Sequence, residues 1–181
     1  MFDGTDALML SAETAIGVDP VNVVKTMARV AERAERDADY AHWADHLGRL
    51  QRTSFPDGPD RITMAITHAA GLAASDAGAE AILCCTRSGR TALAMARFRP
   101  TAQLIGLSPD PVTVRALALS WGVKSLQVET YTTTDELVWF AVESAVHNGL
   151  VKSGQTVLVL AGAPDRPSGA STDVLRIVRV S

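Results

Sequence analysis

The fold class is decided by the stretch AILCCTRSGRT, residues 81–91. Its first five residues form an apolar run too short for a helix, which predicts one buried strand. The next six residues contain a glycine and hydroxyl side chains, and they lead into an apolar helical pattern that reaches Phe98. A buried strand that passes through a short polar turn into a helix indicates an α/β fold.

The same alternation continues along the chain on both sides of this stretch. A helix is expected from Asp60 to near Gly78, and others at residues 109–120 and 132–149. Further strands are expected at residues 104–107, 123–128, 156–160 and 174–180. This pattern predicts a three-layer α/β sandwich with a mostly parallel five-stranded sheet, whose last strand is antiparallel and lies at the edge.

The residues before Asp60 follow a different pattern. The apolar run at residues 7–10 suits one buried strand, and a helix is expected from Pro20 to about Tyr40. Residues 41–59 lose periodicity and end in FPDGP, which is typical of a linker. The predicted organisation is therefore a first segment at residues 1–40, a linker at 41–59 and an α/β domain at 60–181.

Composition excludes several classes of protein. The chain has 181 residues, 47% of them hydrophobic and 20% charged, and its net charge is 17 − 20 = −3. These values exclude a collagen, a disordered tail and a disulfide-rich miniprotein. The acidic balance argues against nucleic-acid binding, and no apolar run approaches the roughly 20 residues of a membrane helix. The adjacent Cys84 and Cys85 would point to opposite faces of a strand, which argues against a disulfide and favours a cytoplasmic protein.

The turn at residues 86–91 is the strongest candidate for binding chemistry. A helix that begins after a strand presents free backbone N–H groups, which favour phosphate. Gly89 lets the backbone approach a ligand, Ser88 and Thr91 add hydroxyl groups, and Arg87 and Arg90 add positive charge. The alternative is an ordinary helix cap with two solvated arginines. The turn matches neither a Walker A loop nor the three-glycine dinucleotide fingerprint.

Two other segments carry weaker signals. The loop at residues 162–171 leaves the end of a strand, where open α/β sheets bind ligands, and either covers a ligand or simply connects two strands. His42 and His46 are four residues apart, but no further ligand accompanies them. We therefore expect a surface helix there and no metal site.

Several motifs resemble pyruvate kinase. DGTDALMLSAET at residues 3–14, Pro20 and VKTM at 24–27 resemble the end of that family's catalytic barrel. The resemblance continues through residues 86–92, 98–100, 121–123 and 154–157, and through Ser168-Gly169 in the tail. It spans nearly the whole chain except residues 41–59, so residues 1–40 are expected to be a helical remnant of the barrel end.

The resemblance implies a function and a set of sites. The complete enzymes of this family transfer a phosphoryl group from phosphoenolpyruvate to ADP in glycolysis, with Mg²⁺ and usually K⁺. Many members bind a phosphorylated regulator in the last domain, so Thr86, Ser88, Gly89 and Thr91 would hold a phosphate with Arg87 nearby. Ser11 and Glu13 match positions at the mouth of the barrel.

Departures from the family pattern limit what the chain is expected to do alone. The family's catalytic lysine and metal-binding carboxylates would lie before residue 1, and phosphoryl transfer depends on such clustered groups. Ala12, Val18-Asp19 and Asp173 replace a glycine, a basic-aromatic pair and an asparagine that are usual in the family. We expect this chain alone to be inactive and to hold no metal or cofactor.

Three interpretations of its role remain open at this stage. The chain is either an enzyme part that meets a separately encoded barrel, a binding module for a phosphorylated metabolite, or a homo-oligomerisation domain. Because the chain resembles a phosphotransferase but lacks the core of the catalytic barrel, the sequence does not decide whether it is an enzyme.

Overall fold

The computed structural model describes residues 4–54, 59–131, 133–162 and 172–181. The chain forms two compact units, Met1–Asp39 and Tyr40–Ser181. The first unit contains α1 (Ala12–Ala15) and α2 (Pro20–Asp37). The second contains the following elements: α3 (Tyr40–Ser54), α4 (Pro59–Asp76), β1 (Ala81–Cys85), α5 (Arg90–Ala96), β2 (Gln103–Ser108), α6 (Pro111–Leu117), β3 (Val123–Gln127), α7 (Thr134–His147), β4 (Thr156–Ala161) and β5 (Val174–Arg179).

In the first unit, α2 begins as the sequence predicts. The side chain of Asp19 accepts a hydrogen bond from the amide of Asn22 at 3.0 Å, and Pro20 occupies the first helical position. The strand expected at residues 7–10 is not formed, and these residues have no regular secondary structure. A strand needs a neighbouring strand to satisfy its backbone groups, and the described residues of this unit offer none.

The prediction of a linker at residues 41–59 is wrong for most of that range, because α3 occupies residues 40–54. Residues 55–58 lie outside the described residues. The helix buries one face: Ala44 and Leu47 pack against the core, and Trp43 Nε1 donates to the carbonyl oxygen of Arg97 at 2.8 Å. The Tyr40 ring lies 5.6 Å from that of Trp121. Residues 40, 43, 44 and 47 follow helical spacing, so the sequence already contained the apolar face of this helix.

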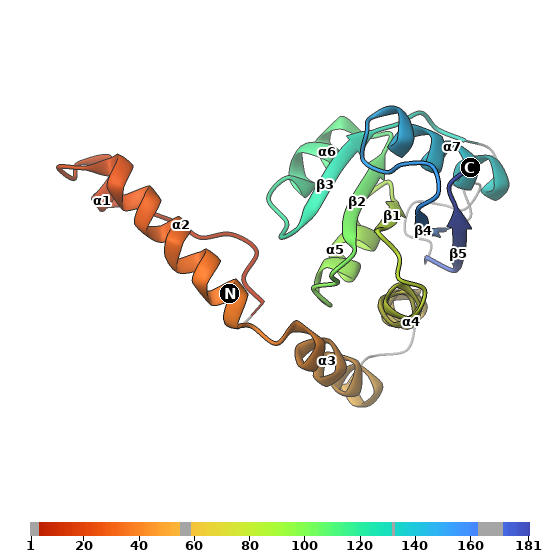
Figure 1. Cartoon of the computed structure of the whole chain (residues 1–181), viewed down its shortest axis with the longest axis horizontal. Coiled ribbons are helices and arrows are strands. Elements are labelled where there is room, and N and C mark those ends of the chain that lie inside the picture. The colour runs from red at the N-terminus through yellow and green to blue at the C-terminus, as the bar shows by residue number, and fades with distance from the viewer. Residues whose placement is uncertain (1–3, 55–58, 132, 163–171) are drawn as a thin grey trace. The chain divides into compact units, whose positions relative to one another are not determined.

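The sheet has the predicted architecture. Its strand order is β3-β2-β1-β4-β5, with β1 to β4 parallel and β5 antiparallel to β4 at the edge (Figure 1). The central strand β1 pairs with β2 on one side and with β4 on the other, so that Leu83 lies between Ile105 and Val159. The prediction of a mostly parallel five-stranded sheet with an antiparallel last strand is confirmed.

A hydrophobic core lies on each face of the sheet. Ile82 and Cys84 face one core together with residues of α4, α5 and α6, whereas Leu83 faces the other core with residues of α7. This alternation of buried side chains along β1 is what a central parallel strand requires. It confirms the three-layer arrangement.

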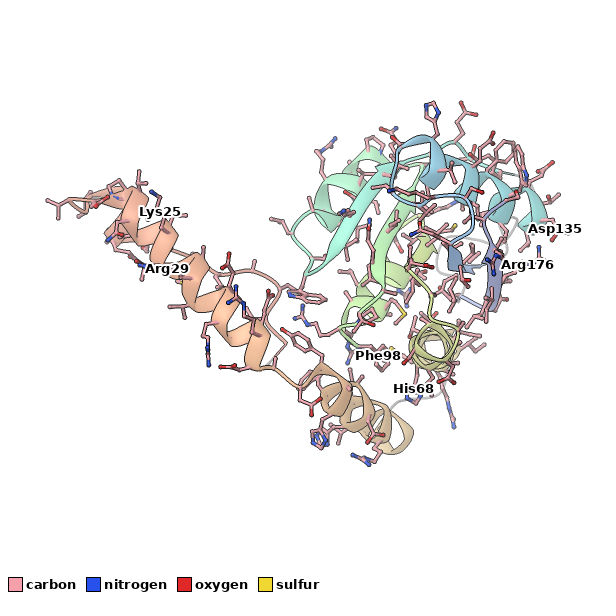
Figure 2. The ribbon with its side chains drawn as sticks, viewed as in Figure 1. Lys25, Arg29, His68, Phe98, Asp135 and Arg176 are labelled. Carbon is pink, nitrogen blue, oxygen red and sulfur yellow. The ribbon has the colours of Figure 1, made fainter. Side chains whose placement is uncertain are left out.

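Two side-chain contacts lie at the margins of this unit. The imidazole of His68 on α4 stacks on the ring of Phe98 with a centroid distance of 5.6 Å (Figure 2). Arg176 on β5 forms an ion pair of 2.8 Å with Asp135 in the first turn of α7 (Figure 2). Each contact joins elements that are far apart in the sequence.

Candidate functional site

The candidate site lies where the strand order reverses. After β1 the chain continues to β2 on one side, whereas β4 later returns to the other side of β1. In open α/β sheets, ligands bind outside the carboxyl ends of the strands at such a switch point. The turn after β1 leaves the sheet here, and β4 ends at the same edge. Residues 163–171, which make up nearly all of the loop expected to cover a ligand or to connect two strands, lie outside the described residues.

Gly89 shapes the turn after β1. Its φ of +81° lies in the left-handed region, and its carbonyl oxygen accepts the first α5 hydrogen bond, from the amide of Leu93 at 2.9 Å. A Cβ at this position would lie 3.3 Å from Leu117 Cδ2. Both the backbone angle and the packing therefore favour glycine.

Hydroxyl groups from the β2–α6 connection hold the same turn. Thr113 Oγ1 donates to the carbonyl oxygen of Arg87 at 2.8 Å, and Ser108 Oγ approaches that oxygen at 3.5 Å. Thr113 Oγ1 also lies 3.1 Å from Asp110 Oδ2. Sequence reasoning did not single out Ser108, Asp110 or Thr113. The sequence feature that could have revealed them is the Asp110-Pro111 pair shortly after a strand, because such a pair marks the capped start of a helix.

The predicted phosphate residues take different environments around this turn. Arg87 and Ser88 are exposed, Thr86 is half-buried, and Gly89 is buried in the turn. Thr91 is only 5% exposed, and its hydroxyl lies 2.6 Å from the hydroxyl of Thr172. Arg90, the second cation of the motif, is also exposed. Thr91 thus differs from the exposed Arg87, Ser88 and Arg90 by facing the interior.

Charge at the turn is mixed. Arg87 and Arg90 supply positive charge, and neither Arg87 nor Ser88 makes a side-chain hydrogen bond to another described residue. Asp110 supplies one negative charge, and its pKa is held below the usual range, first by the backbone N–H of Val112, which it caps. The arrangement offers a hydroxyl and a guanidinium to an anion.

The two cysteines of β1 do not provide a nucleophile. Cys84 is fully buried, and both thiols are free. Burial raises the pKa of Cys84 far above its ordinary value and that of Cys85 to about 12. Because the thiolate is the reactive form, these side chains act as buried apolar groups.

Ser11 and Glu13 lie in the other unit. The Glu13 carboxylate accepts a hydrogen bond from the amide of Ser11 at 3.1 Å at the start of α1, and both residues are exposed. Within the described residues, no group of three or more His, Cys, Asp or Glu is placed to hold a metal ion. None of the described helices combines the length and hydropathy that crossing a membrane requires.

Comparison with known proteins identifies the family. The family model described as "Pyruvate kinase, alpha/beta domain" matches residues 64–178. The chain belongs to the pyruvate kinase family. The matched region contains the turn after β1, the hydroxyl groups that hold it and nearly the whole sheet.

Full-length pyruvate kinases match along the entire chain. The pyruvate kinase of Clostridium acetobutylicum is 36% identical over 178 residues, covering 98% of this chain and 36% of that protein. The pyruvate kinase of Geobacillus stearothermophilus is 39% identical over 181 residues, covering 100% of this chain and 30% of that protein. The chain therefore spans about a third of the length of these relatives and corresponds to their C-terminal part.

A solved structure agrees with this assignment. The crystal structure of a pyruvate kinase from Cryptosporidium parvum superposes with a TM-score of 0.78 at 27% identity. It covers 99% of this chain, which in turn covers 34% of that one. The three-layer fold is that of the pyruvate kinase C-terminal α/β domain.

Proposed function

We propose that this chain supplies the C-terminal α/β portion of a pyruvate kinase, and that its turn at residues 86–91 binds the phosphate of a phosphorylated metabolite. The complete enzyme converts phosphoenolpyruvate and ADP to pyruvate and ATP, a step of glycolysis in the cytoplasm. One observation carries the binding proposal. The turn at the sheet's switch point presents an exposed guanidinium and an exposed hydroxyl, with no partner for either among the described residues.

The solvent exposure of each side chain indicates which groups of the turn would bind the ligand. Arg87 and Ser88 reach solvent, and Thr86 is accessible in part. A guanidinium and a hydroxyl are both hydrogen-bond donors to phosphate oxygens, and the charged donor forms the stronger bond. The backbone is already fixed by Thr113, so little ordering is required when a ligand binds.

Calorimetric titration tests this proposal. The chain is titrated with fructose 1,6-bisphosphate, AMP and ribose 5-phosphate, and binding of at least one is expected. Arg87→Gln and Ser88→Ala should each weaken that binding by about tenfold, the effect of losing one charged or polar hydrogen bond. Arg29→Gln, which removes an exposed arginine of α2, should leave it unchanged. Absence of binding by all three compounds, or equal affinities of all variants, would contradict the proposal.

We also propose that these 181 residues alone do not catalyse phosphoryl transfer. Ser11 and Glu13 match positions at the barrel mouth, and these two side chains offer no clustered positive charge for the transferred phosphoryl group. The Mg²⁺ and K⁺ of the family's enzymes belong, in this proposal, to the preceding part of the enzyme, whether on the same chain or encoded separately. Pyruvate formation from phosphoenolpyruvate and ADP by residues 1–181, above a blank without protein, would overturn this.

An assembly role is favoured by a second observation. Helix α4 exposes an apolar stripe at helical spacing, comprising Ile62, Ala65, Ala69 and Leu72. The neighbouring edge strand β5 exposes Ile177, which is 49% accessible. We propose that this face contacts a second copy of the chain. Sedimentation should show an oligomer that Leu72→Lys dissociates, and a monomer at all concentrations would exclude it.

A further inference from the structure

Three threonines from distant parts of the sequence meet beside the candidate site. The hydroxyl of Thr91, in the first turn of α5, lies 2.6 Å from the hydroxyl of Thr172, which precedes β5. The amide of Thr172 in turn donates to Thr63 Oγ1 on α4 at 3.0 Å. Thr91 and Thr172 are 5% and 4% exposed, and Thr63 is half-buried. We call these three residues the threonine cluster.

Each member of the cluster has a distinct task. Thr63 fixes the backbone of Thr172, because its hydroxyl accepts the Thr172 amide. With its backbone held, Thr172 presents its hydroxyl to Thr91, and one of the two hydroxyls donates to the other away from water. A buried hydroxyl that loses such a partner is costly, so this pair resists separation.

The cluster acts directly on the candidate turn. Thr91 follows Gly89 by two residues, and the carbonyl oxygen of Gly89 accepts from Leu93 to start α5. Whatever holds the Thr91 side chain therefore sets the position of the first turn of α5. On the opposite side, Thr113 holds the carbonyl oxygen of Arg87. The turn at residues 87–89 is thus fixed from two sides.

We infer that Thr172 and Thr63 are positioning residues for the phosphate-binding turn, and that they act on it through the side chain of Thr91. The effect on ligand binding rests on the proposed function, whereas the effect on the turn itself does not. Neither Thr63 nor Thr172 belongs to the motif at residues 86–91, and Thr172 is 81 positions from Thr91.

Two measurements on the whole chain test this inference. In Thr172→Val, the amide of Leu93 should exchange its hydrogen about tenfold faster, because the start of α5 loses its anchor. The amide of Leu137 occupies the equivalent position in α7, bonded to Thr133 at 3.1 Å, and should keep its rate. Affinity for the phosphorylated compound that binds best should fall about tenfold in parallel.

Matched variants separate positioning from loss of folding. Thr172→Ser keeps the hydroxyl and should restore both readouts. Thr67→Val removes a fully buried hydroxyl whose partners among the described residues are two backbone carbonyls of α4, and it should change neither readout. The double variant Thr91→Val/Thr172→Val removes both partners, which leaves no unsatisfied hydroxyl. It should fold even if Thr172→Val does not, and still show fast exchange at Leu93.

The outcomes distinguish this inference from the proposed function. If the unmodified chain binds none of the three phosphorylated compounds, the proposed function fails, and exchange at Leu93 still decides whether the cluster positions the turn. The inference is overturned if exchange at Leu93 stays at its original rate in both valine variants. It is also overturned if Thr67→Val accelerates that exchange as much as Thr172→Val does.

Discussion

The hydroxyl of Thr113 donates to the carbonyl oxygen of Arg87 at 2.8 Å, across 26 positions of the sequence. Through this bond the start of α6 determines the backbone of the turn after β1. The same hydroxyl lies 3.1 Å from Asp110 Oδ2, so it also belongs to the cap of α6. The conformation of the candidate binding turn is therefore built into the neighbouring β2–α6 connection.

Removing this hydroxyl should weaken both the fold and the turn. Thr113→Val keeps the shape of the side chain but leaves the Arg87 carbonyl with only the long contact to Ser108. We expect the free energy of unfolding in urea to fall by about 1 kcal/mol, the contribution of a typical hydrogen bond. Thr113→Ser should recover most of that loss. A Thr113→Val chain as stable as the original would show that the bond contributes nothing.

Alanine substitutions at Gly89 and Gly78 distinguish the cost of backbone strain from the cost of altered packing. Both have positive φ, +81° and +58°, but a Cβ meets Leu117 only at Gly89 and finds open space at Gly78. Gly78→Ala should cost about 1 kcal/mol of unfolding free energy from the left-handed backbone alone. Gly89→Ala should cost more, and should also reduce phosphate binding. Equal losses in the two variants would rule out the packing contribution of Leu117.

The buried thiols predict a decline of stability in alkali. Burial raises the pKa of Cys84 and Cys85 in the fold above the ordinary 9.0. The folded chain therefore holds these protons more tightly than the unfolded chain, so the stabilisation is complete below about pH 9 and is lost as pH rises further. Urea unfolding from pH 7 to 10 should show this decline, and Cys84→Ala/Cys85→Ala should flatten it. A slope unchanged in the double variant would contradict the assignment.

The packing of α3 on α4 depends on a glycine. A Cβ at Gly48 would overlap the His68 ring, which is itself stacked on Phe98. Gly48→Ala should therefore displace that ring and lower stability despite the higher helix propensity of alanine. Gly71→Ala on α4 meets only Met95 Cε at 3.5 Å, so it should raise the unfolding free energy by about 0.5–1 kcal/mol. Stabilisation by both substitutions would mean that His68 moves freely.

Local sequence signals predicted most of the α/β unit because its strands and helices are short, regular and strongly patterned. The stretch at residues 81–91 became β1, the turn and the start of α5 as expected. The prediction of a strand at residues 7–10 was wrong, because a strand needs neighbouring strands and a local sequence pattern does not reveal them. The α3 helix was missed because its apolar residues are spread among charged ones, and only the spacing from Tyr40 to Leu47 marks it.

The candidate site was only partly predictable for a related reason. The composition of residues 86–91 is a local property, so the exposed Arg87 and Ser88 could be named from the sequence. The role of Thr91 depends on Thr172, and the shape of the turn depends on Thr113, which are contacts between distant segments. Nothing in the local motif indicates that one of its hydroxyls faces the interior.

The central claim is that the turn at residues 86–91 binds a phosphorylated metabolite, and thermal unfolding with added ligand tests it most directly. Fructose 1,6-bisphosphate, AMP and ribose 5-phosphate are each added to the chain at millimolar concentration. A ligand at about 100 times its dissociation constant adds about 2.7 kcal/mol of stability. The account predicts a clear rise in Tm with at least one compound, and a much smaller rise in Arg87→Gln/Ser88→Ala. No rise with any compound, or the same rise in the double variant, would contradict it.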